Sequence, residues 1–421
     1  MMSQNSSQNH SPPTRCLAPT PFLEVRFVLV AVCGCSLAVV SMVENSLVLL
    51  TLASRRRYRN SYGLYLIFLA CTDVLLSFQY VYIKTVPVFM DYYKWFDIHR
   101  LWFSNLIPML TLSHCSMTAA SLLILTASVE QYLITVQSPV GKHLQQRRLK
   151  FCLFSLFMGL LVNFSLVFEY KTVRNHLCTG GLSELMLSLT AMGRHPLFSW
   201  VWRLWFRDLT TVFAPFLAIA YFNVRTVMYL NSQRKRIDRR RQRSVLNALL
   251  LDKESSNLTL RIALQVKLRF QVKKRQTTRA FIGITISYLV SNLLTVALKI
   301  AELIDSYYLL SIRPFYYFSI DAVGILRVLS CILRLPIYCI CKPDILRDVA
   351  RTAVCKCSVA HRRRYSTMLL ERDLSMFEDG RSSAGSRRGD QRKSFFISML
   401  DTFEEELNSH NSTRFETVEL N

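Results

Sequence analysis

The stretch Tyr62–Pro87 reads YGLYLIFLACTDVLLSFQYVYIKTVP and decides the fold. It is apolar almost throughout, and Asp73 and Lys84 are its charged side chains. A helix rises about 1.5 Å per residue, so about 20 apolar residues are enough to cross the hydrocarbon core of a bilayer. The stretch therefore predicts a membrane-spanning helix that carries a carboxylate near its middle.

Six more apolar runs of comparable length predict six more spans, so the expected fold class is an all-α membrane protein, a seven-transmembrane helix bundle. The third and fifth of the seven spans exceed the bilayer thickness and are expected to tilt or to project beyond it. An amphipathic stretch, Pro343–Ala350, predicts a short further helix after the last span. The six additional runs are Val25–Ala53, Leu101–Ile134, Leu149–Tyr170, Ser199–Leu230, Thr278–Leu303 and Phe315–Ile340.

The composition agrees with a membrane protein that crosses the bilayer several times. The chain has 421 residues, 51% of them hydrophobic, and a formal net charge of +24. Its mean hydropathy is +0.23. High apolarity and high charge coexist because long apolar runs alternate with short basic clusters, which is typical of a polytopic membrane protein and argues against a nucleic-acid partner.

The distribution of basic residues predicts the orientation. Fourteen Lys and Arg residues lie in 231–277 and fourteen more follow Ile340, whereas the segments on the opposite side carry about seven in all. Because cytoplasmic loops are enriched in Lys and Arg, the carboxyl terminus is expected in the cytoplasm and the amino terminus outside the cell. Sequons at Asn5 and Asn9 predict glycosylation on that outer side, at the plasma membrane.

The expected organisation has four parts. Residues 1–24 form an extracellular segment, 25–340 the seven-span domain, 341–356 the amphipathic region, and 357–421 a disordered cytoplasmic tail. The basic loop 231–277 is expected to attract anionic membrane lipids. Two amphipathic stretches in this loop predict helical extensions of spans five and six: Leu246–Leu251 and Leu258–Phe270.

Ionisable side chains inside a membrane are costly, so each is a candidate functional residue. Asp73, Arg327 and Arg334 fall within the predicted spans, while a second group lies toward the outer ends and would form a charged vestibule for a polar or peptide ligand. The alternative to a ligand vestibule is that the side chains of this second group extend to the membrane–water interface, where their charges are hydrated. No Cys/His spacing is typical of a metal site, so neither a metal, a cofactor nor enzymatic activity is expected. The second group is Lys84, Glu169, Arg203, Arg207, Asp208, Lys299, Glu302 and Asp321.

Short motifs on five of the predicted spans, in the same order and register, make the chain resemble rhodopsin-like G-protein-coupled receptors. The resemblance covers about Val25–Lys356. It implies a cell-surface receptor that signals through a heterotrimeric G protein, with arrestin and kinases as further partners at the tail. The motifs are Asn45 on span one, Leu69-Ala70-Cys71-Thr72-Asp73 on span two, Glu130-Gln131-Tyr132 on span three, Pro215 on span five, and Leu335-Pro336-Ile337-Tyr338 on span seven.

A finer resemblance is to FMRFamide-type neuropeptide receptors, a set expanded in nematodes. Phe168-Glu169-Tyr170, Ser291-Asn292 and Glu302 carry it. It implies a peptide ligand ending in Arg-Phe-amide, whose cation needs an acidic partner and whose ring needs an aromatic slot. Ser113 replaces the aspartate of amine receptors, and span seven lacks the lysine of opsins. The expected ligand contacts are His114, Glu169, Arg207, Asp208, Lys299, Glu302, Asp321 and Arg327.

The chain departs from the family pattern at positions that matter for signalling. Gln131 stands where the family has an arginine that pairs with the neighbouring acid and later reaches the G protein, so Glu130 is expected to lose that partner. Coupling by the expected G-protein face, Glu130, Gln131 and Tyr132, is therefore in question. Arg334 stands at the family's asparagine of span seven, within an expected polar switch formed with Asn45, Asp73 and Tyr338.

The family uses the aspartate of span two and the asparagine of span seven to help hold a sodium ion. We expect the Arg334 guanidinium to take the place of that ion and to pair with Asp73, because an unpaired charge at that depth is costly. Extension of Arg334 to the inner headgroups is the alternative.

The resemblance also bears on four cysteines. Leu106 occupies the place of the cysteine that usually tops helix three, so Cys178 lacks its usual partner and Cys16 is offered as a substitute. Cys355 and Cys357 follow the amphipathic stretch at the spacing where receptors are often palmitoylated, although two free cytosolic thiols are equally compatible with the sequence.

Three other functions stay open from the sequence. They are a seven-span chemosensory receptor for small molecules, a receptor-like protein that modulates others without signalling, and a transporter or membrane enzyme. The absence of an internal repeat argues against the last of these.

Overall fold

The computed structural model describes residues 22–59, 61–175, 184–250, 258–304, 313–341 and 345–352. Asn5, Asn9, Cys16, Cys178, Cys355 and Cys357 lie outside these residues, so the predicted glycosylation, disulfide and palmitoylation sites stay predictions. The same holds for the tail 357–421 and for the segment 1–21.

The predicted all-α seven-helix bundle is confirmed. Seven helices of the described part are long and apolar enough to cross a membrane: Leu23–Ala53, Gly63–Tyr93, Asp97–Thr135, Arg148–Glu169, Phe198–Gln233, Thr278–Ile304 and Phe315–Ile340. Most of their ends lie within four residues of the predicted ends. The chain is therefore a multi-pass membrane protein.

The largest difference is at the end of span two, which continues to Tyr93 although Pro87 was expected to end it. Pro87 lies in the first turn of α5 (Val86–Tyr93). Because the chain is already helical before Pro87, the missing N–H removes one hydrogen bond to the preceding turn, which costs stability but does not end the span. The π-helical segment η3 (Val81–Thr85) precedes this turn and joins it to α4 (Gly63–Tyr80).

The other spans are also assembled from consecutive segments. Span one joins α1 (Leu23–Arg26), the π-helical η2 (Phe27–Gly34) and α2 (Cys35–Ala53). Span three is α6 (Phe96–Thr135), and span four joins α8 (Arg148–Asn163) to α9 (Leu166–Glu169). Span five joins the π-helical η5 (Phe198–Phe213) to α11 (Ala214–Leu250), and spans six and seven are α12 (Leu258–Ile304) and α14 (Arg313–Cys341).

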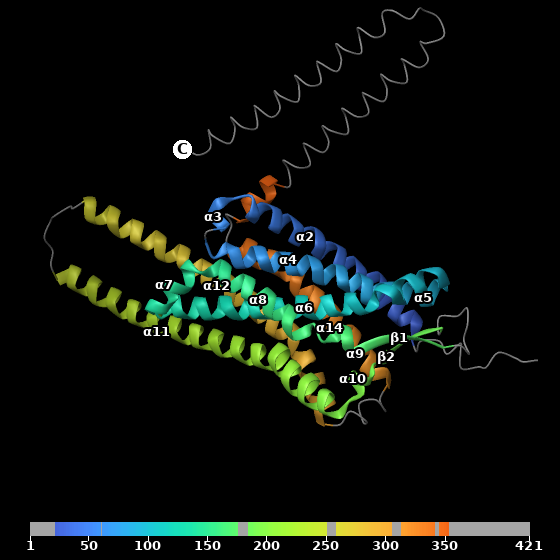
Figure 1. Cartoon of the computed structure of the whole chain (residues 1–421). Coiled ribbons are helices and arrows are strands. Elements are labelled where there is room, and N and C mark those ends of the chain that lie inside the picture. Colours follow the sequence, from blue (N-terminus) through green and yellow to red (C-terminus); the bar gives the residue numbers. More distant parts are fainter. Residues whose placement is uncertain are drawn as a thin grey trace, which may run out of the picture. The chain divides into compact units, whose positions relative to one another are not determined.

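Helix α6 lies in the middle of the bundle, where it packs against α4, α8 and α11 (Figure 1). On the other side α2 packs between α4 and α14, and α14 also packs against α12. Because α11 reaches Leu250 and α12 begins at Leu258, both extend past their membrane spans, as the amphipathic stretches predicted.

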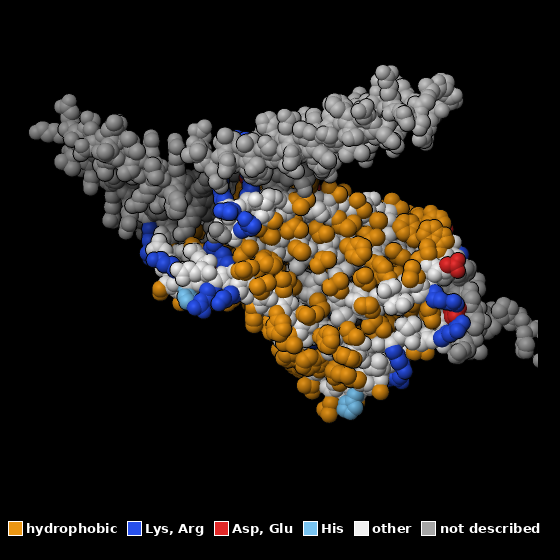
Figure 2. Space-filling model, turned by 45° about the horizontal axis from the view of Figure 1, so that its top comes forward, with side chains coloured by type: hydrophobic (Ala, Val, Ile, Leu, Met, Phe, Trp, Pro, Cys, Tyr) orange, Lys and Arg blue, Asp and Glu red, His pale blue; other side chains and the backbone are white. Residues whose placement is uncertain are grey.

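Polar side chains gather inside the bundle and apolar side chains cover its outside. Asp73, Glu130 and Glu169 are completely buried. Large apolar side chains such as Leu217, Val290 and Ile340 are exposed. Figure 2 shows one face as a broad area of hydrophobic side chains with Lys and Arg on either side of it. Such a surface is stable in lipid, where apolar side chains need no cover.

One end of the bundle carries a β-hairpin, which the sequence analysis did not predict. Strands β1 (Tyr170–Arg174) and β2 (Leu185–Leu189) pair antiparallel, with Tyr170 opposite Leu189 and Arg174 opposite Leu185. The short helix α10 (Ala191–Arg194) follows and leads into span five. We call this the hairpin end; it also holds the start of span one and the end of span six.

The opposite end carries α3 (Arg56–Arg59), α7 (Pro139–Gln146) and the helix at 345–352, and we call it the basic end. The last helix confirms the predicted amphipathic stretch, because Ile345 and Val349 are buried against spans one, two and seven. The Tyr58 hydroxyl donates a 2.8 Å hydrogen bond to Asp348, which also pairs with Arg55 at 2.6 Å. Burial and the Asp348 carboxylate raise the pKa of Tyr58 to about 12.

Helices α8 and α6 approach closely at Gly159, which gives a test of the packing. Gly159→Ala should lower the free energy of unfolding by about 1–3 kcal/mol. Its Cβ would lie 2.8 Å from the Cys115 carbonyl oxygen and 3.0 Å from the Ala119 amide nitrogen, and backbone atoms cannot rotate away. Gly283→Ala is the control, because its Cβ would meet the Ile337 side chain at 3.0 Å. Melting temperatures in detergent should fall clearly for Gly159→Ala alone; equal shifts would contradict this packing.

Candidate functional site

An ion pair lies in the middle of the bundle, between α4 and α14. The Arg334 Nη1 contacts the Asp73 Oδ2, and the two residues are 4% and 0% exposed. The Cys331 thiol donates to the other Asp73 oxygen at 3.4 Å. The predicted pairing of Asp73 with Arg334 is therefore confirmed, and Arg334 does not extend to the headgroups.

Hydrogen bonds tie this pair to span one. The Asn45 amide donates to the carbonyl oxygens of Ser41 at 3.0 Å and of Cys331 at 3.4 Å. The Ser77 hydroxyl lies 2.7 Å from the Ser41 hydroxyl and 2.8 Å from the Asp73 carbonyl oxygen. Three of the four residues of the expected polar switch, Asn45, Asp73 and Arg334, thus belong to one network. The fourth, Tyr338, is buried next to Arg334 on α14.

Glu130 has a cation partner from another helix in place of the arginine that Gln131 replaces. Arg148, the first residue of α8, donates through Nε to Glu130 Oε1 at 2.8 Å, and its Nη2 contacts the same oxygen. The Tyr65 hydroxyl donates to Oε2 at 2.8 Å. The charge that Gln131 does not supply therefore comes from the next span, eighteen positions after Glu130. Sequence reasoning missed Arg148 because it counted this residue among the basic loop residues.

Gln131 joins span three to span six. Its side-chain amide donates to the Thr278 hydroxyl at 2.8 Å, and Gln131 and Thr278 are 5% and 3% exposed. Tyr132 packs its ring against Phe222 of α11, with 5.7 Å between the ring centroids. The expected G-protein face thus contacts α8, α11 and α12 inside the bundle.

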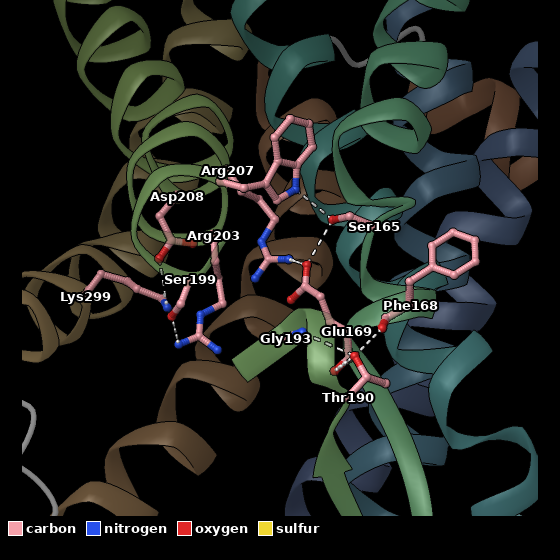
Figure 3. Close-up of polar contacts among 11 residues, drawn as sticks. Ser165, Phe168, Glu169, Thr190, Gly193, Ser199, Arg203, Arg207, Asp208 and Lys299 are labelled. Atoms are coloured by element: carbon pink, nitrogen blue, oxygen red, sulfur yellow. Dashed lines mark hydrogen bonds and ion pairs between the residues drawn. The ribbon is translucent and has the colours of Figure 1, made fainter. Parts of the chain in front are cut away.

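A second set of charges lies at the hairpin end. Glu169, at the end of α9, pairs with Arg207 of η5 at 2.5 Å and accepts a 2.9 Å hydrogen bond from Ser165 (Figure 3). Ser165 in turn accepts a 2.9 Å hydrogen bond from the Trp202 indole. Both members of the ion pair are buried, so each neutralises the other and the contact holds span four against span five.

Asp208 and Glu302 lie nearer the surface and share one lysine. Lys299 Nζ is 3.2 Å from Asp208 and 3.1 Å from Glu302. The Glu302 and Lys299 side chains are 43% and 35% exposed, which leaves this cluster with accessible negative charge. It is the part of the predicted vestibule that suits a cationic ligand group.

Asp321 of α14 is 2% exposed and contacts two cations. Arg26 donates to it through Nε at 2.8 Å, and Lys84 Nζ is 3.4 Å away. Arg26 could not be assigned a partner from the sequence, because this residue lies at the edge of span one and Asp321 is 295 positions away.

His114 and Arg327 face the space that the helices enclose at this end. His114 is exposed, yet its electrostatic neighbours are Arg207, Arg327 and Lys299, which belong to three other helices. Its exposed surface therefore faces the interior of the bundle. Arg327 lines a cavity of about 80 Å³ together with residues of α4, η3 and α6. Three of the eight predicted ligand contacts are committed to buried ion pairs, and three form the partly exposed cluster around Lys299. The first three are Glu169, Arg207 and Asp321, the second three are Asp208, Lys299 and Glu302, and His114 and Arg327 remain at the enclosed space.

The comparisons with known proteins give no family for the chain: no protein-family model matches it, and no curated protein is similar to it. Among the residues that the structure describes, no group of three or more His, Cys, Asp or Glu side chains is placed to hold a metal ion.

The central pair can be tested by removing its members singly and together. Asp73→Asn and Arg334→Asn should each lower the free energy of unfolding by about 3–5 kcal/mol, because each leaves an unpaired buried charge, and the double variant should recover most of the loss. Melting temperature and surface expression are the measurements. Asp208→Asn is the control, with an expected cost below about 1 kcal/mol because its pair is partly exposed. A double variant no better than the singles would show that the two charges do not depend on each other.

Proposed function

We propose that the protein is a cell-surface receptor of the plasma membrane that binds a peptide and signals through a heterotrimeric G protein. Its amino terminus would lie outside the cell and its carboxyl terminus in the cytoplasm, which makes the hairpin end extracellular and the basic end cytoplasmic. The observation that carries the proposal is the buried polar network around Asp73 and Arg334. A lipid-filled environment penalises such groups, so proteins keep them in spans mainly where they serve function.

The contacts at the basic end give the proposal a mechanism. Seven-helix proteins can exist in two packings, and a ligand shifts the population toward the packing that it binds better. Gln131 and Thr278 hold α6 and α12 together in the present packing. Separation of these helices would expose the buried side chain of Gln131 to a G protein. The neutral hydrogen bond between Gln131 and Thr278 would then stabilise the inactive packing. In the family that the sequence resembles, a charged contact of the arginine at this position has that role.

The charges of the hairpin end support a peptide as the ligand. The partly exposed cluster of Asp208 and Glu302 suits a cationic side chain such as arginine, as the resemblance to FMRFamide-type receptors implies. Aromatic rings of Tyr316 and Tyr317 lie at the start of α14, on the same side. A peptide with a basic and an aromatic residue could use both.

A chemosensory receptor for small molecules is the second candidate. The size of the cavity favours it, because about 80 Å³ holds a few non-hydrogen atoms, whereas pockets for drug-sized ligands measure about 300–1,000 Å³. In the peptide proposal only the end of the ligand enters this cavity, and the rest lies across the vestibule.

The proposal is tested in cells that express the protein at their surface with a promiscuous Gα. Pooled peptides, with and without carboxyl-terminal amidation, are applied and calcium is recorded. A dose-dependent response is expected. Silence from protein proven to be at the surface, together with responses to small molecules, would favour the chemosensory function. Silence toward both would contradict signalling.

The Gln131–Thr278 contact predicts a change in basal signalling. Thr278→Val removes the hydroxyl and keeps the shape, so the packing that holds α6 to α12 should lose about 0.5–1.5 kcal/mol. Basal G-protein activity should rise about two- to tenfold. Thr295→Val on the same helix is the control, because the Thr295 hydroxyl has no hydrogen-bond partner. Unchanged or lowered basal activity in Thr278→Val, at equal surface expression, would contradict this role.

A further inference from the structure

The cavity that Arg327 lines lies among spans two, three and seven, and several of its lining side chains are polar. Gln79 and Lys84 come from span two, Ser113 from span three, and Arg327 from span seven. Its volume of about 80 Å³ is enough for several water molecules or for one small polar group of a ligand.

Arg327 differs from the other cations around it because the described residues give it no carboxylate. Five cations of the bundle interior contact an acid: Arg26, Lys84, Arg148, Arg207 and Arg334. No described Asp or Glu lies within ion-pair distance of Arg327, whose electrostatic neighbours include Tyr288 and Cys331 but no carboxylate. A guanidinium inside a membrane span is costly without a counter-charge, so this position calls for an anion.

The charges around the cavity add up in the same direction. Arg26 and Lys84 both pair with Asp321, and Lys84 also lies near Arg327, so these four groups carry three positive charges and one negative charge. The excess of two positive charges favours an anionic group in the cavity over a cation or a neutral amide. His114 lies close to Arg327 and to two further cations, and it offers no negative charge.

A second polar residue of the cavity, Gln79, indicates which ligand group lies next to the anion. Gln79 is 1% exposed and its side-chain nitrogen donates to Ser116 at 3.3 Å. Its Oε1 is buried and has no hydrogen-bond partner, which leaves one strong acceptor unsatisfied. A buried acceptor without a partner costs about 1–3 kcal/mol, so a ligand that brings an N–H donor would relieve it.

We propose that this cavity binds the carboxylate of the ligand at Arg327 and an adjacent ligand N–H at Gln79 Oε1. A carboxylate next to an amide N–H is what a peptide with a free carboxyl terminus presents, and an N-acyl amino acid presents the same pair. The proposal deepens the proposed receptor function and rests on it for the signalling consequence. An amidated terminus, which the resemblance implies, has the N–H and lacks the charge.

Binding is measured on the purified full chain in lipid nanodiscs, by the rise in melting temperature with ligand. The probes are the dipeptide Arg-Phe and N-acetylphenylalanine, each as the free acid and as the amide. The free acids should raise the melting temperature with affinities at least about tenfold above those of the amides, because a charge-assisted hydrogen bond is lost in the amide. A response to Arg-Phe alone identifies a peptide as the source of the carboxylate. A response to both free acids shows that small N-acyl amino acids bind as well.

Two variants assign the binding to Arg327. Arg327→Gln should reduce the affinity for the free acids about tenfold or more and leave the amides unchanged, whereas Arg327→Lys should recover part of it. Arg203→Gln is the matched control, because Arg203 contacts Ser199 at the hairpin end and does not line the cavity. Without ligand, Arg327→Gln should melt at or above the temperature of the native protein, since it removes an unpaired charge. A much lower melting temperature would mean that Arg327 has a structural partner, which overturns the proposal.

The outcomes separate this inference from the proposed function. Equal affinities for acids and amides, or no loss in Arg327→Gln, overturn the carboxylate site even if a peptide activates the protein in cells. Binding of the free acids that depends on Arg327, without any G-protein signal, supports the site and contradicts the receptor function.

Discussion

The ion pair between Asp73 and Arg334 is the interaction on which the rest of the structure depends. Two charges inside the bundle are tolerated because each lies against the other and because Cys331 donates a further hydrogen bond to the carboxylate. The pair holds α4 against α14, and Asn45 brings α2 to the same point. Three spans therefore meet at a contact that lipid cannot replace, and the polar interior of the bundle is organised on either side of it.

The charges of the two ends follow the same rule of neutralisation with different consequences. At the basic end, Glu130 is neutralised by Arg148, and Gln131 links α6 to α12 through a neutral hydrogen bond. A second neutral contact, between the hydroxyls of Ser121 and Tyr288, joins the same two helices further along. No charge has to be separated when α6 and α12 part at these contacts, which suits a switch. At the hairpin end, Glu169 and Asp321 have their cations, whereas Arg327 has none among the described residues and defines where a ligand's charge is needed.

The sequence predicted the spans well because their signal is local: a long apolar run needs no knowledge of its neighbours. It also predicted the Asp73–Arg334 pair, because the family resemblance assigns these two positions to one site and an unpaired charge at that depth is costly. It did not predict that Arg148 would pair with Glu130 or Arg26 with Asp321, since both cations sit at the edges of spans and resemble loop residues. The hairpin of β1 and β2 was also missed, because its pairing lies in a connecting segment without a strong alternation of polar and apolar residues. The two ion pairs also depend on how each helix is rotated about its own axis, which the apolar run of a span does not specify.

The most direct test of the receptor function is nucleotide exchange on purified Gα subunits, measured with the full chain in nanodiscs. The four main classes of Gα are supplied in turn with Gβγ, and GTP-analogue binding is followed with and without the peptide that is active in cells. The account predicts that at least one class exchanges nucleotide faster with the protein than with empty nanodiscs, and faster again with the peptide. Equal rates for every class, in a preparation whose melting shows a folded bundle, would contradict the claim that this seven-helix protein passes a signal to a G protein.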